Sequence, residues 1–205
     1  MDASEWDVRY AKAELEWGAE PNRFLVQEIE GLEPGRALDI AAGEGRNAIW
    51  VAARGWMVTA VDFSPVAIEK ARQPDAEPSR WRLAAERGVD VEWVVADVVD
   101  YAPGTEVFDL AVVFYLHLVA SEMRKVLGRV AAALRRGGTL LIVGHDRANL
   151  TDGVGGPQDP AILLDAQVVA SELEDLVIEK AERIMRRVEG AEREAIDTLV
   201  RARKP

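Results

Sequence analysis

The sequence predicts an α/β fold: a seven-stranded, mostly parallel sheet with helices on both faces. From Arg36 onward, short apolar runs alternate with helical stretches, which is typical of right-handed βαβ units. Near the C-terminus, two apolar runs follow one another with only a short polar turn between them. That arrangement predicts a hairpin, so at least one strand runs antiparallel to the others.

The expected elements follow from hydrophobic periodicity and from glycine and proline positions. Strands are expected at 37–41, 57–61, 89–96, 108–115, 139–144, 176–188 and 195–203. Helices are expected at 46–54, from Ser64 onward, and at 80–87, 122–134 and 165–174. Ser64 suits the N-cap of its helix and Pro65 the first helical position. The run 135–138 (Arg-Arg-Gly-Gly) is expected to end the helix before it.

Composition excludes several classes of function. The 205 residues carry a formal net charge of −11, which disfavours a nucleic-acid partner. The chain has no Cys, which excludes disulfides, thiolate catalysis and Cys-based metal sites, and no other metal-ligand spacing occurs, so no metal is expected. No apolar run approaches the roughly 18 residues of a membrane span. The acidic start does not resemble a secretory signal. We expect a cytoplasmic protein with no membrane partner.

A glycine-rich turn, Gly43-Glu44-Gly45-Arg46-Asn47-Ala48, stands between the first predicted strand and its helix. Glycines at such a turn let the backbone approach a ligand closely. The turn fits the dinucleotide pattern G-x-G-x-x-[GA], and Asp62 follows Gly43 by 19 residues, where an acidic side chain would bind a ribose. A tight turn with no ligand, followed by a helix-capping Asp62, is the alternative interpretation.

Three features favour a nucleoside-type ligand over a dinucleotide. Asp39 lies inside the first strand, where its carboxylate can hold a cationic ligand or anchor the glycine turn. Asp97 follows the third strand, where it can accept from an adenine amino group while the Val98 N–H reaches the ring; a simple turn carboxylate is the alternative. The C-terminal hairpin adds an antiparallel strand beyond the fifth strand. A one-domain chain of this length also has no room for the separate substrate domain that is typical of dehydrogenases.

These motifs resemble those of class I S-adenosylmethionine-dependent methyltransferases over essentially the whole chain. Residues 38–47 (Leu-Asp-Ile-Ala-Ala-Gly-Glu-Gly-Arg-Asn) resemble the first motif of that class, 62–64 (Asp-Phe-Ser) its ribose motif, and 96–98 (Ala-Asp-Val) its adenine motif. Residues 108–110 and 136–140 resemble the signatures of its fourth and fifth strands. The segment 6–10 and the glycine turn further resemble the tellurite-resistance and thiopurine methyltransferase group. Two departures are Ala42, where many relatives carry Cys, and an apparent insertion at 73–83.

The resemblance implies a single Rossmann-like methyltransferase domain over 1–205. It would comprise an N-terminal helical lid (1–35), a cofactor-binding core (36–145), and a substrate loop with the C-terminal hairpin (146–205). The implied cofactor is S-adenosyl-L-methionine, with S-adenosyl-L-homocysteine as its product. The implied cofactor-binding residues are Tyr10, Trp17, Asp39, Ala41, Gly43, Gly45, Arg46, Asp62, Phe63, Ser64, Asp97, Val98 and Phe114.

The N-terminal aromatic residues allow two interpretations. Trp6, Tyr10 and Trp17 can pack as an aromatic stripe on the domain, which is the expectation for Trp6. Tyr10 and Trp17 can instead close over the cofactor as a lid. Arg9 or Arg46 can then pair with the carboxylate of the cofactor.

Both histidines of the chain follow predicted strands, at the sheet edge where ligands of open α/β sheets bind. His145 is the better candidate for a general base because Asp146 is its neighbour, although adjacent residues of a strand point to opposite faces. His117 and Asp146 are candidates for a base or for substrate positioning. A structural hydrogen-bonding role is the alternative for each histidine. The long loop at 146–160 is rich in Gly, Pro, Asn and Asp and is expected to be functional.

The predicted activity is transfer of a methyl group, by in-line displacement, to S, Se, Te, O or N of a small molecule. Only acceptors that must lose a proton need a base. The subgroup resemblance favours a soft sulfur, selenium or tellurium acceptor. An NAD-dependent oxidoreductase, and a methyltransferase-fold protein that binds the cofactor without methyl transfer, stay open as alternatives. A monomer or homodimer is expected.

Overall fold

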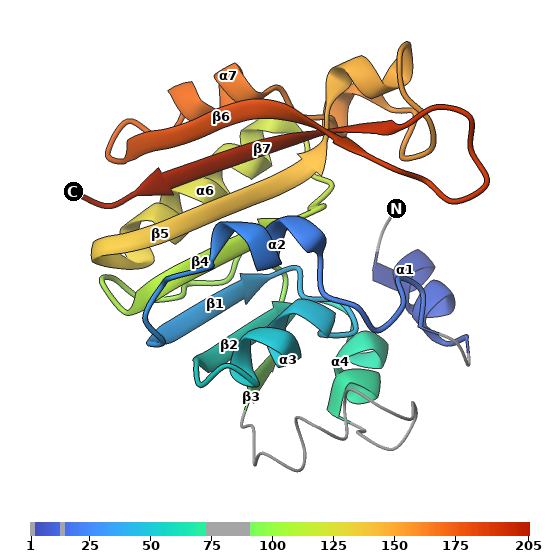
Figure 1. Ribbon diagram of the computed structural model, residues 1–205. Helices are drawn as coiled ribbons and strands as arrows, with labels where there is room; N and C mark the ends of the chain where they lie inside the picture. The colour runs from blue at the N-terminus through green and yellow to red at the C-terminus, as the bar shows by residue number, and fades with distance from the viewer. Residues whose placement is uncertain (1–2, 13–14, 73–90) are drawn as a thin grey trace. The chain divides into compact units, whose positions relative to one another are not determined.

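The computed structural model describes residues 3–12, 15–72 and 91–205 (Figure 1). These fall into two compact units, the first reaching Tyr101 and the second beginning at Ala102. The helix expected at 80–87 and the insertion expected at 73–83 lie outside the described residues.

The first unit carries three parallel strands in the order β3-β2-β1. Its elements are α1 (Ala3–Tyr10), α2 (Arg23–Glu28), β1 (Arg36–Ile40), α3 (Arg46–Ala52), β2 (Met57–Asp62), α4 (Pro65–Arg72) and β3 (Val91–Val95). After its first residue, every residue of β1 and of β2 is buried. This continuous burial explains why both strands are near-continuous apolar runs rather than alternating ones.

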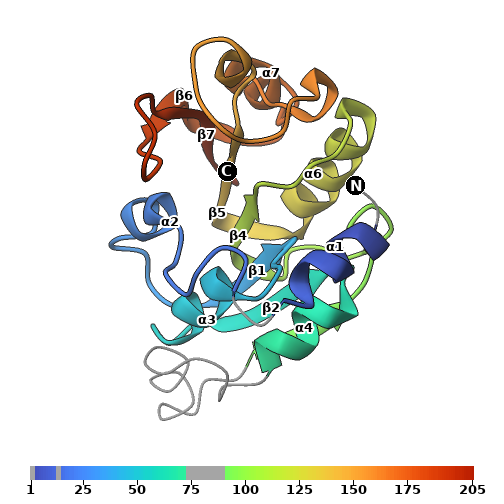
Figure 2. The same cartoon turned by 90° about the vertical axis from the view of Figure 1, so that its right-hand side faces the viewer.

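Local sequence sets the start of α4 as predicted. The Ser64 hydroxyl accepts a hydrogen bond from the Ala67 N–H at 3.1 Å, and Pro65 occupies the first helical position. The N-terminal helix α1 packs against α4, as Figures 1 and 2 show. α4 therefore connects the N-terminal segment to the core of the first unit.

The second unit carries four strands in the order β4-β5-β7-β6. Its elements are β4 (Phe108–Phe114), α6 (Ala120–Ala133), β5 (Leu134–His145), the 3₁₀ helices η1 (Arg147–Leu150) and η2 (Pro160–Ile162), α7 (Ala166–Ser171), β6 (Val177–Arg186) and β7 (Ala195–Arg203). β4 and β5 are parallel, whereas β7 is antiparallel to both β5 and β6. The predicted C-terminal hairpin is thereby confirmed.

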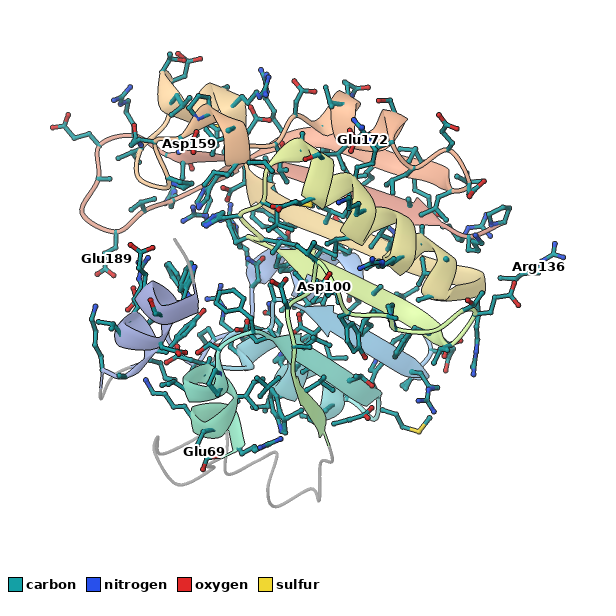
Figure 3. All side chains as sticks on the ribbon, turned by 180° about the vertical axis from the view of Figure 1, so that it is seen from behind. Glu69, Asp100, Arg136, Asp159, Glu172 and Glu189 are labelled. Atoms are coloured by element: carbon teal, nitrogen blue, oxygen red, sulfur yellow. The ribbon has the colours of Figure 1, made fainter. Side chains whose placement is uncertain are left out.

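Helix α6 is amphipathic, with Met123, Val126, Leu127 and Val130 buried. On its other side, Arg124 donates to Glu172 at 2.9 Å, just after α7 (Glu172 is labelled in Figure 3). Figure 3 also labels Arg136 and Glu189, which project away from the body of the second unit. Apolar and charged residues thus separate at the helical period that the sequence shows.

The run 135–138 differs from its prediction. The helix ends at Ala133, and these residues belong to β5 instead of forming a helix terminus. The Gly137 N–H donates to the Lys204 carbonyl at 2.8 Å, and the Lys204 N–H donates to the Gly138 carbonyl at 2.9 Å. Pairing with the C-terminal residues satisfies these backbone groups in an extended conformation, which sequence neighbours alone do not reveal.

The fold class is the predicted one. Parallel β-strand pairs are joined through helices, and an antiparallel hairpin closes the chain. Within the described residues, no helix combines the length and the apolar character that crossing a membrane requires.

Candidate functional site

The strand ends of the first unit bring most of the predicted cofactor-binding residues together. The Ala42 N–H donates to the Val61 carbonyl at 3.0 Å, which holds the glycine turn beside the end of β2. The Ala96 N–H donates to the Asp62 carbonyl at 3.0 Å, which holds the start of the adenine motif beside the same strand end. Residues far apart in the sequence therefore meet at one edge of the β3-β2-β1 sheet.

The glycine turn requires glycine at two positions. Gly43 and Gly45 have φ angles of +55° and +80°, in the left-handed region. A Cβ at Gly45 would lie 2.3 Å from the Trp93 ring of β3, so no other residue fits there. A Cβ at Gly43 would lie 3.0 Å from the Tyr10 hydroxyl oxygen. Ala41 also adopts a left-handed φ, of +59°, without being glycine.

Asp62 links the end of β2 to the glycine turn. Its buried carboxylate accepts hydrogen bonds from the Gly43 N–H at 2.7 Å and from the Ser64 N–H at 2.9 Å. Burial raises the pKa of Asp62, and these backbone hydrogen bonds only partly oppose the shift. Each carboxylate oxygen can accept more than one donor, so the turn-shaping role leaves capacity for a ligand hydroxyl.

Asp39 is a fully buried acid next to this turn. Burial, followed by the negative charge of Asp62, raises the pKa of Asp39 to about 7, against hydrogen bonding from the Ala48 N–H. Its Oδ2 has no hydrogen-bond partner among the residues that the structure describes. A buried carboxylate oxygen without a donor is costly, and a cationic ligand group would satisfy it.

Asp97 lies two residues after the end of β3 and is exposed. Its Oδ1 accepts from the Val99 N–H at 2.9 Å, which is the simple turn that the sequence left as an alternative. The Val98 side chain beside it is buried. An exposed carboxylate next to a buried apolar residue suits recognition of an aromatic ring that carries an amino group. The role of Asp97 as an adenine ligand stays a prediction.

Tyr10 and Trp17 lie at the glycine turn. Tyr10 is buried, stacks on Trp6 at 5.4 Å between ring centroids, and forms a side-chain hydrogen bond with Trp17. Burial, with the nearby Asp62 charge, raises the pKa of the Tyr10 hydroxyl. The backbone carbonyl of Trp17 accepts from Arg46 at 2.9 Å. The N-terminal segment therefore packs on the turn within the first unit, as both interpretations of these aromatics require.

Arg9 contacts the aromatic residues of the N-terminal segment. Its guanidinium lies 5.1 Å from the Trp6 ring centroid and 5.0 Å from that of Trp17, and its Nε donates to Glu16. The cation–π contacts and the ion pair hold the segment that follows α1. Pairing of Arg9 with a cofactor carboxylate, which the sequence suggested, would require this arrangement to change.

Glu44 is a structural member of the turn that sequence reasoning missed. It is buried, pairs with Lys70 of α4 at 2.7 Å, and accepts from the Glu16 N–H at 2.8 Å. The signal in the sequence is a charged residue that stands between two glycines of the turn. All three residues are buried in the fold. Glu44 fixes the N-terminal segment to the turn.

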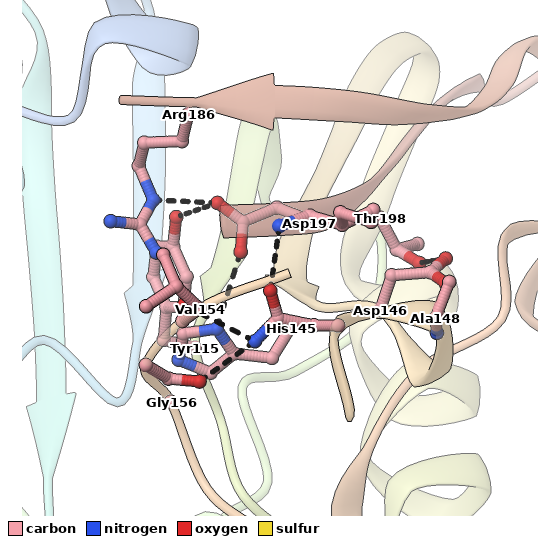
Figure 4. Close-up of polar contacts among 12 residues, drawn as sticks. Tyr115, His145, Asp146, Ala148, Val154, Gly156, Arg186, Asp197 and Thr198 are labelled. Carbon is pink, nitrogen blue, oxygen red and sulfur yellow. Dashed lines mark hydrogen bonds and ion pairs between the residues drawn. The ribbon is translucent and has the colours of Figure 1, made fainter. Parts of the chain in front are cut away.

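In the second unit, His145 ends β5 and faces a carboxylate on the neighbouring strand. His145 and Asp197 are direct partners in the β5–β7 register, and the His145 Nδ1 lies 3.2 Å from the Asp197 Oδ1 (Figure 4). The His145 ring also lies 5.0 Å from the Tyr115 ring and 5.7 Å from the His117 ring, between centroids. The two histidines singled out from the sequence are therefore neighbours.

Asp146 makes other contacts. Its Oδ1 accepts from the Ala148 N–H at 2.8 Å, and its Oδ2 accepts from the Thr198 hydroxyl at 2.7 Å (Figure 4). Its Oδ1 also pairs with Arg183 at 3.0 Å. It is fully buried and caps η1. As the alternation of a strand requires, Asp146 and His145 interact with different partners.

Asp197 is the second residue that sequence reasoning missed. It is fully buried, and its Oδ2 accepts from the Tyr115 hydroxyl at 2.8 Å and from the Arg186 Nε at 2.7 Å (Figure 4). Burial opposes ionisation, but hydrogen bonds with His145, Arg186 and Tyr115 hold the pKa of Asp197 below its usual value. The available signal was a single acidic residue within the strand Ala195–Arg203.

Three further residues that the resemblance assigns to cofactor binding differ in burial. Phe63 is half-buried after β2, Ser64 is buried, and Phe114 is buried at the end of β4 in the second unit. Among the described residues, no group of three or more His, Asp or Glu side chains is placed to hold a metal ion.

The comparisons with known proteins agree with this geometry. Residues 37–138 match the family described as "Methyltransferase domain". This segment contains the glycine turn, Asp62 and Asp97. No curated protein matches the chain.

Several solved structures share the fold. NodS, an N-methyltransferase from Bradyrhizobium japonicum WM9 in complex with S-adenosyl-L-homocysteine, is 21% identical, with 99% of this chain and 98% of that chain covered and a TM-score of 0.70. TehB from Haemophilus influenzae is 18% identical, with 90% and 62% covered and a TM-score of 0.71. The [4+2]-cyclase SpnF is 20% identical, with 89% and 79% covered and a TM-score of 0.65. The resemblance to class I methyltransferases, drawn from the motifs, is confirmed at the level of fold.

Proposed function

We propose that this chain is an S-adenosyl-L-methionine-dependent methyltransferase that acts on a small molecule. The observation that carries the proposal is the buried Asp39 oxygen without a donor, beside Asp62 and the glycine turn, in a segment that matches the methyltransferase domain family. An anionic, partly unsatisfied site suits a ligand that carries an ammonium and a sulfonium group. The NodS structure, which contains the demethylated product, supports the same cofactor.

The residues of the first unit divide the binding task. Asp62 accepts from the ribose hydroxyls, Asp97 accepts from the adenine amino group, and Asp39 balances the positive charge of the amino-acid portion. Backbone at Ala41, Gly43, Gly45, Phe63, Ser64, Val98 and Arg46 lines the same strand ends. Tyr10 and Trp17 exclude water. S-adenosyl-L-methionine, when bound, supplies an electrophilic methyl group on sulfur.

In the second unit, His145 is the candidate that accepts a proton from an acceptor that carries one. Phe114 stays a candidate for cofactor binding. His117 and Asp146 position the histidine and its loop. Alignment of donor and acceptor contributes most of the rate, and a base adds about 10²–10⁴-fold for acceptors that must lose a proton. S, Se, Te, O and N acceptors are all within this chemistry.

Another activity on the same fold is the second candidate. The cyclase SpnF shares the fold, so binding of the cofactor and transfer of its methyl group must be measured separately. A protein that binds the cofactor without transferring its methyl group would bind S-adenosyl-L-methionine through the residues of the first unit. It would methylate no acceptor.

Calorimetric titration with S-adenosyl-L-methionine, S-adenosyl-L-homocysteine and NAD tests the proposal. We expect binding of the first two only. Asp62→Ala should weaken binding by about 1.5–3 kcal/mol, which corresponds to roughly 10–150-fold, because it removes a charged hydrogen-bond partner. Asp100→Ala is the matched control: it removes an exposed acid of the same unit (labelled in Figure 3) and should leave affinity unchanged. Binding of NAD alone would refute the proposal.

A further inference from the structure

We infer that the outer edge of β6 pairs antiparallel with β6 of a second copy of this chain, in a register centred on Ala181. The inference concerns the second unit alone and does not depend on the proposed activity. It gives an interface to a strand that neither the cofactor motifs nor the proposed function uses.

The first step concerns the free edge of β6. Among the described residues, β6 pairs with β7 and with no other strand, and it is the outermost strand of the second unit (Figure 1). Large apolar side chains near its two ends are exposed, by 48% for Val177, 36% for Ile178 and 47% for Met185. In β7, by contrast, residues 195–200 are all buried. An edge strand of this kind is a template on which another strand can pair.

The second step concerns the charges at the middle of β6. Lys180, Ala181 and Glu182 follow one another, and both charged side chains are exposed. When two copies pair antiparallel about Ala181, Lys180 of each copy comes opposite Glu182 of the other, which makes two ion pairs across the edge. A shift of one residue places Lys180 opposite Ala181 or Arg183, and a shift of two places Lys180 or Glu182 opposite itself. These registers lose both ion pairs, and most of them oppose like charges.

The apolar ends of β6 favour the same register. In it, the start of β6 in one copy lies along the end of β6 in the other, so Val177 and Ile178 come beside Ile184 and Met185. The β-bulge between Ile178 and Lys180 moves this match by one residue and keeps apolar residues beside one another. The exposed apolar side chains would therefore cover each other in the dimer.

The two charged residues that flank this centre are balanced within the chain. Glu179 pairs with Arg201 and Arg203 at 2.8 and 3.0 Å. Arg183 pairs with the buried Asp146 at 3.0 Å. Neither residue therefore brings an uncompensated charge to the edge, and the pairing of Lys180 with Glu182 decides the register.

The backbone at the centre of β6 can accept a second strand. The Ala181 carbonyl accepts a hydrogen bond from the Gln167 side-chain amide of α7 at 3.0 Å, from outside the β6–β7 ladder. In the dimer, the Ala181 N–H of the second copy would donate to this carbonyl in place of the amide. Because one hydrogen bond replaces another, the exchange costs little.

Sedimentation velocity of the full chain, from about 1 to 500 μM, tests for the dimer. A single pair of strands is a small interface, so we expect a dimer that dissociates on dilution. Lys180→Glu and Glu182→Lys should each weaken dimerisation by more than about tenfold, because both ion pairs become like-charge contacts. Lys125→Glu is the matched control: it reverses an exposed lysine on α6 and should leave dimerisation unchanged.

A mixture of Lys180→Glu and Glu182→Lys should form a heterodimer. One variant then carries two acidic side chains at these positions and the other two basic ones, so both ion pairs return across the edge. Each variant alone should be monomeric, and formation of the heterodimer shows that both are folded. Dimers that persist in each variant alone, or a mixture that stays monomeric, would overturn the inference.

A cysteine at the centre of β6 tests the register, since the chain has no other Cys. In the register centred on Ala181, the two Ala181 Cα atoms would lie about 5.5 Å apart, within the range that a disulfide spans. Ala181→Cys should therefore cross-link two copies under mild oxidation, whereas Met185→Cys, near the end of the same strand, should not. Equal cross-linking of both variants would overturn the inference. A parent chain that is monomeric at every concentration would also overturn it, and would leave the edge to a strand of another protein.

Discussion

The Asp62 carboxylate accepts a hydrogen bond from the Gly43 N–H at 2.7 Å, although 19 residues separate the two in the chain. The same acid therefore shapes the glycine turn and, in the proposed function, holds the ribose. Its contact with Ser64 also ties it to the start of α4. Because a substitution at Asp62 affects both roles, cofactor affinity and thermal stability should be measured together.

The buried Asp39 should make cofactor binding depend on pH. With a pKa of about 7 in the free protein, Asp39 is mostly protonated at pH 6 and mostly ionised at pH 8. A bound cation favours the ionised form, so binding releases a proton and affinity for S-adenosyl-L-methionine should rise about tenfold between these pH values. Calorimetry in buffers of different ionisation enthalpy would detect the proton. Asp39→Asn should abolish the pH dependence of the affinity. If the affinity of that variant changed with pH as much as that of the parent, another group would be responsible.

Asp39 should also lower the stability of the free protein at higher pH. Its folded pKa is raised from 3.8, so the folded state binds more protons than the unfolded state between about pH 4 and 7. Stability contributed by Asp39 therefore falls across that window. Asp39→Asn should be more stable than the parent at pH 8 by about 2–4 kcal/mol, and the gain should disappear below pH 4. Urea unfolding of both proteins at pH 8 and below pH 4 measures this difference in the free energy of unfolding. A gain that does not vary with pH would contradict the assignment of the raised pKa to Asp39.

The backbone at Ala41 predicts a stabilising substitution. Ala41 has a φ of +59°, and the left-handed conformation costs a non-glycine residue about 1–2 kcal/mol. Ala41→Gly removes that cost but makes the unfolded chain more flexible, so we expect a net gain of about 0.5–1 kcal/mol. Differential scanning calorimetry should show a higher Tm. Ala42→Gly, at a position without a positive φ, should instead lower it.

The glycine turn and its acids could be predicted from the sequence because each signal there is local. Gly43 and Gly45 follow β1, and Asp62 is the last residue of β2. The ends of these parallel strands meet at one edge of the sheet. Asp197 could not be predicted as the partner of His145, since only the β5–β7 register places the two opposite each other. Register depends on the packing of whole strands, whereas the sequence showed Asp146 merely as the next residue.

Gly45 should tolerate no side chain unless Trp93 is also replaced by a smaller residue. Gly45→Ala adds a Cβ at 2.3 Å from the Trp93 ring and strains a φ of +80°, so we expect a loss of about 2–4 kcal/mol. Trp93→Leu alone should destabilise by leaving a cavity. In the double variant the steric part of the Gly45→Ala loss should vanish. A double-mutant cycle by urea unfolding measures the coupling, and additive losses would show that the two residues do not meet.

Arg186 should stabilise the protein chiefly by compensating the buried charge of Asp197. The folded pKa of Asp197 is lowered, so its ion pair contributes stability above the unfolded pKa of about 3.8 and loses it as the pH falls through the folded value. Arg186→Gln leaves that charge buried with fewer donors, so we expect a loss of about 3–5 kcal/mol at pH 7 that shrinks below pH 4. Arg203→Gln, which removes an exposed pair with Glu179, should cost less than about 1 kcal/mol. Urea unfolding at pH 7 and pH 3 distinguishes the two, and equal losses for both variants at pH 7 would mean that Asp197 is stabilised without Arg186.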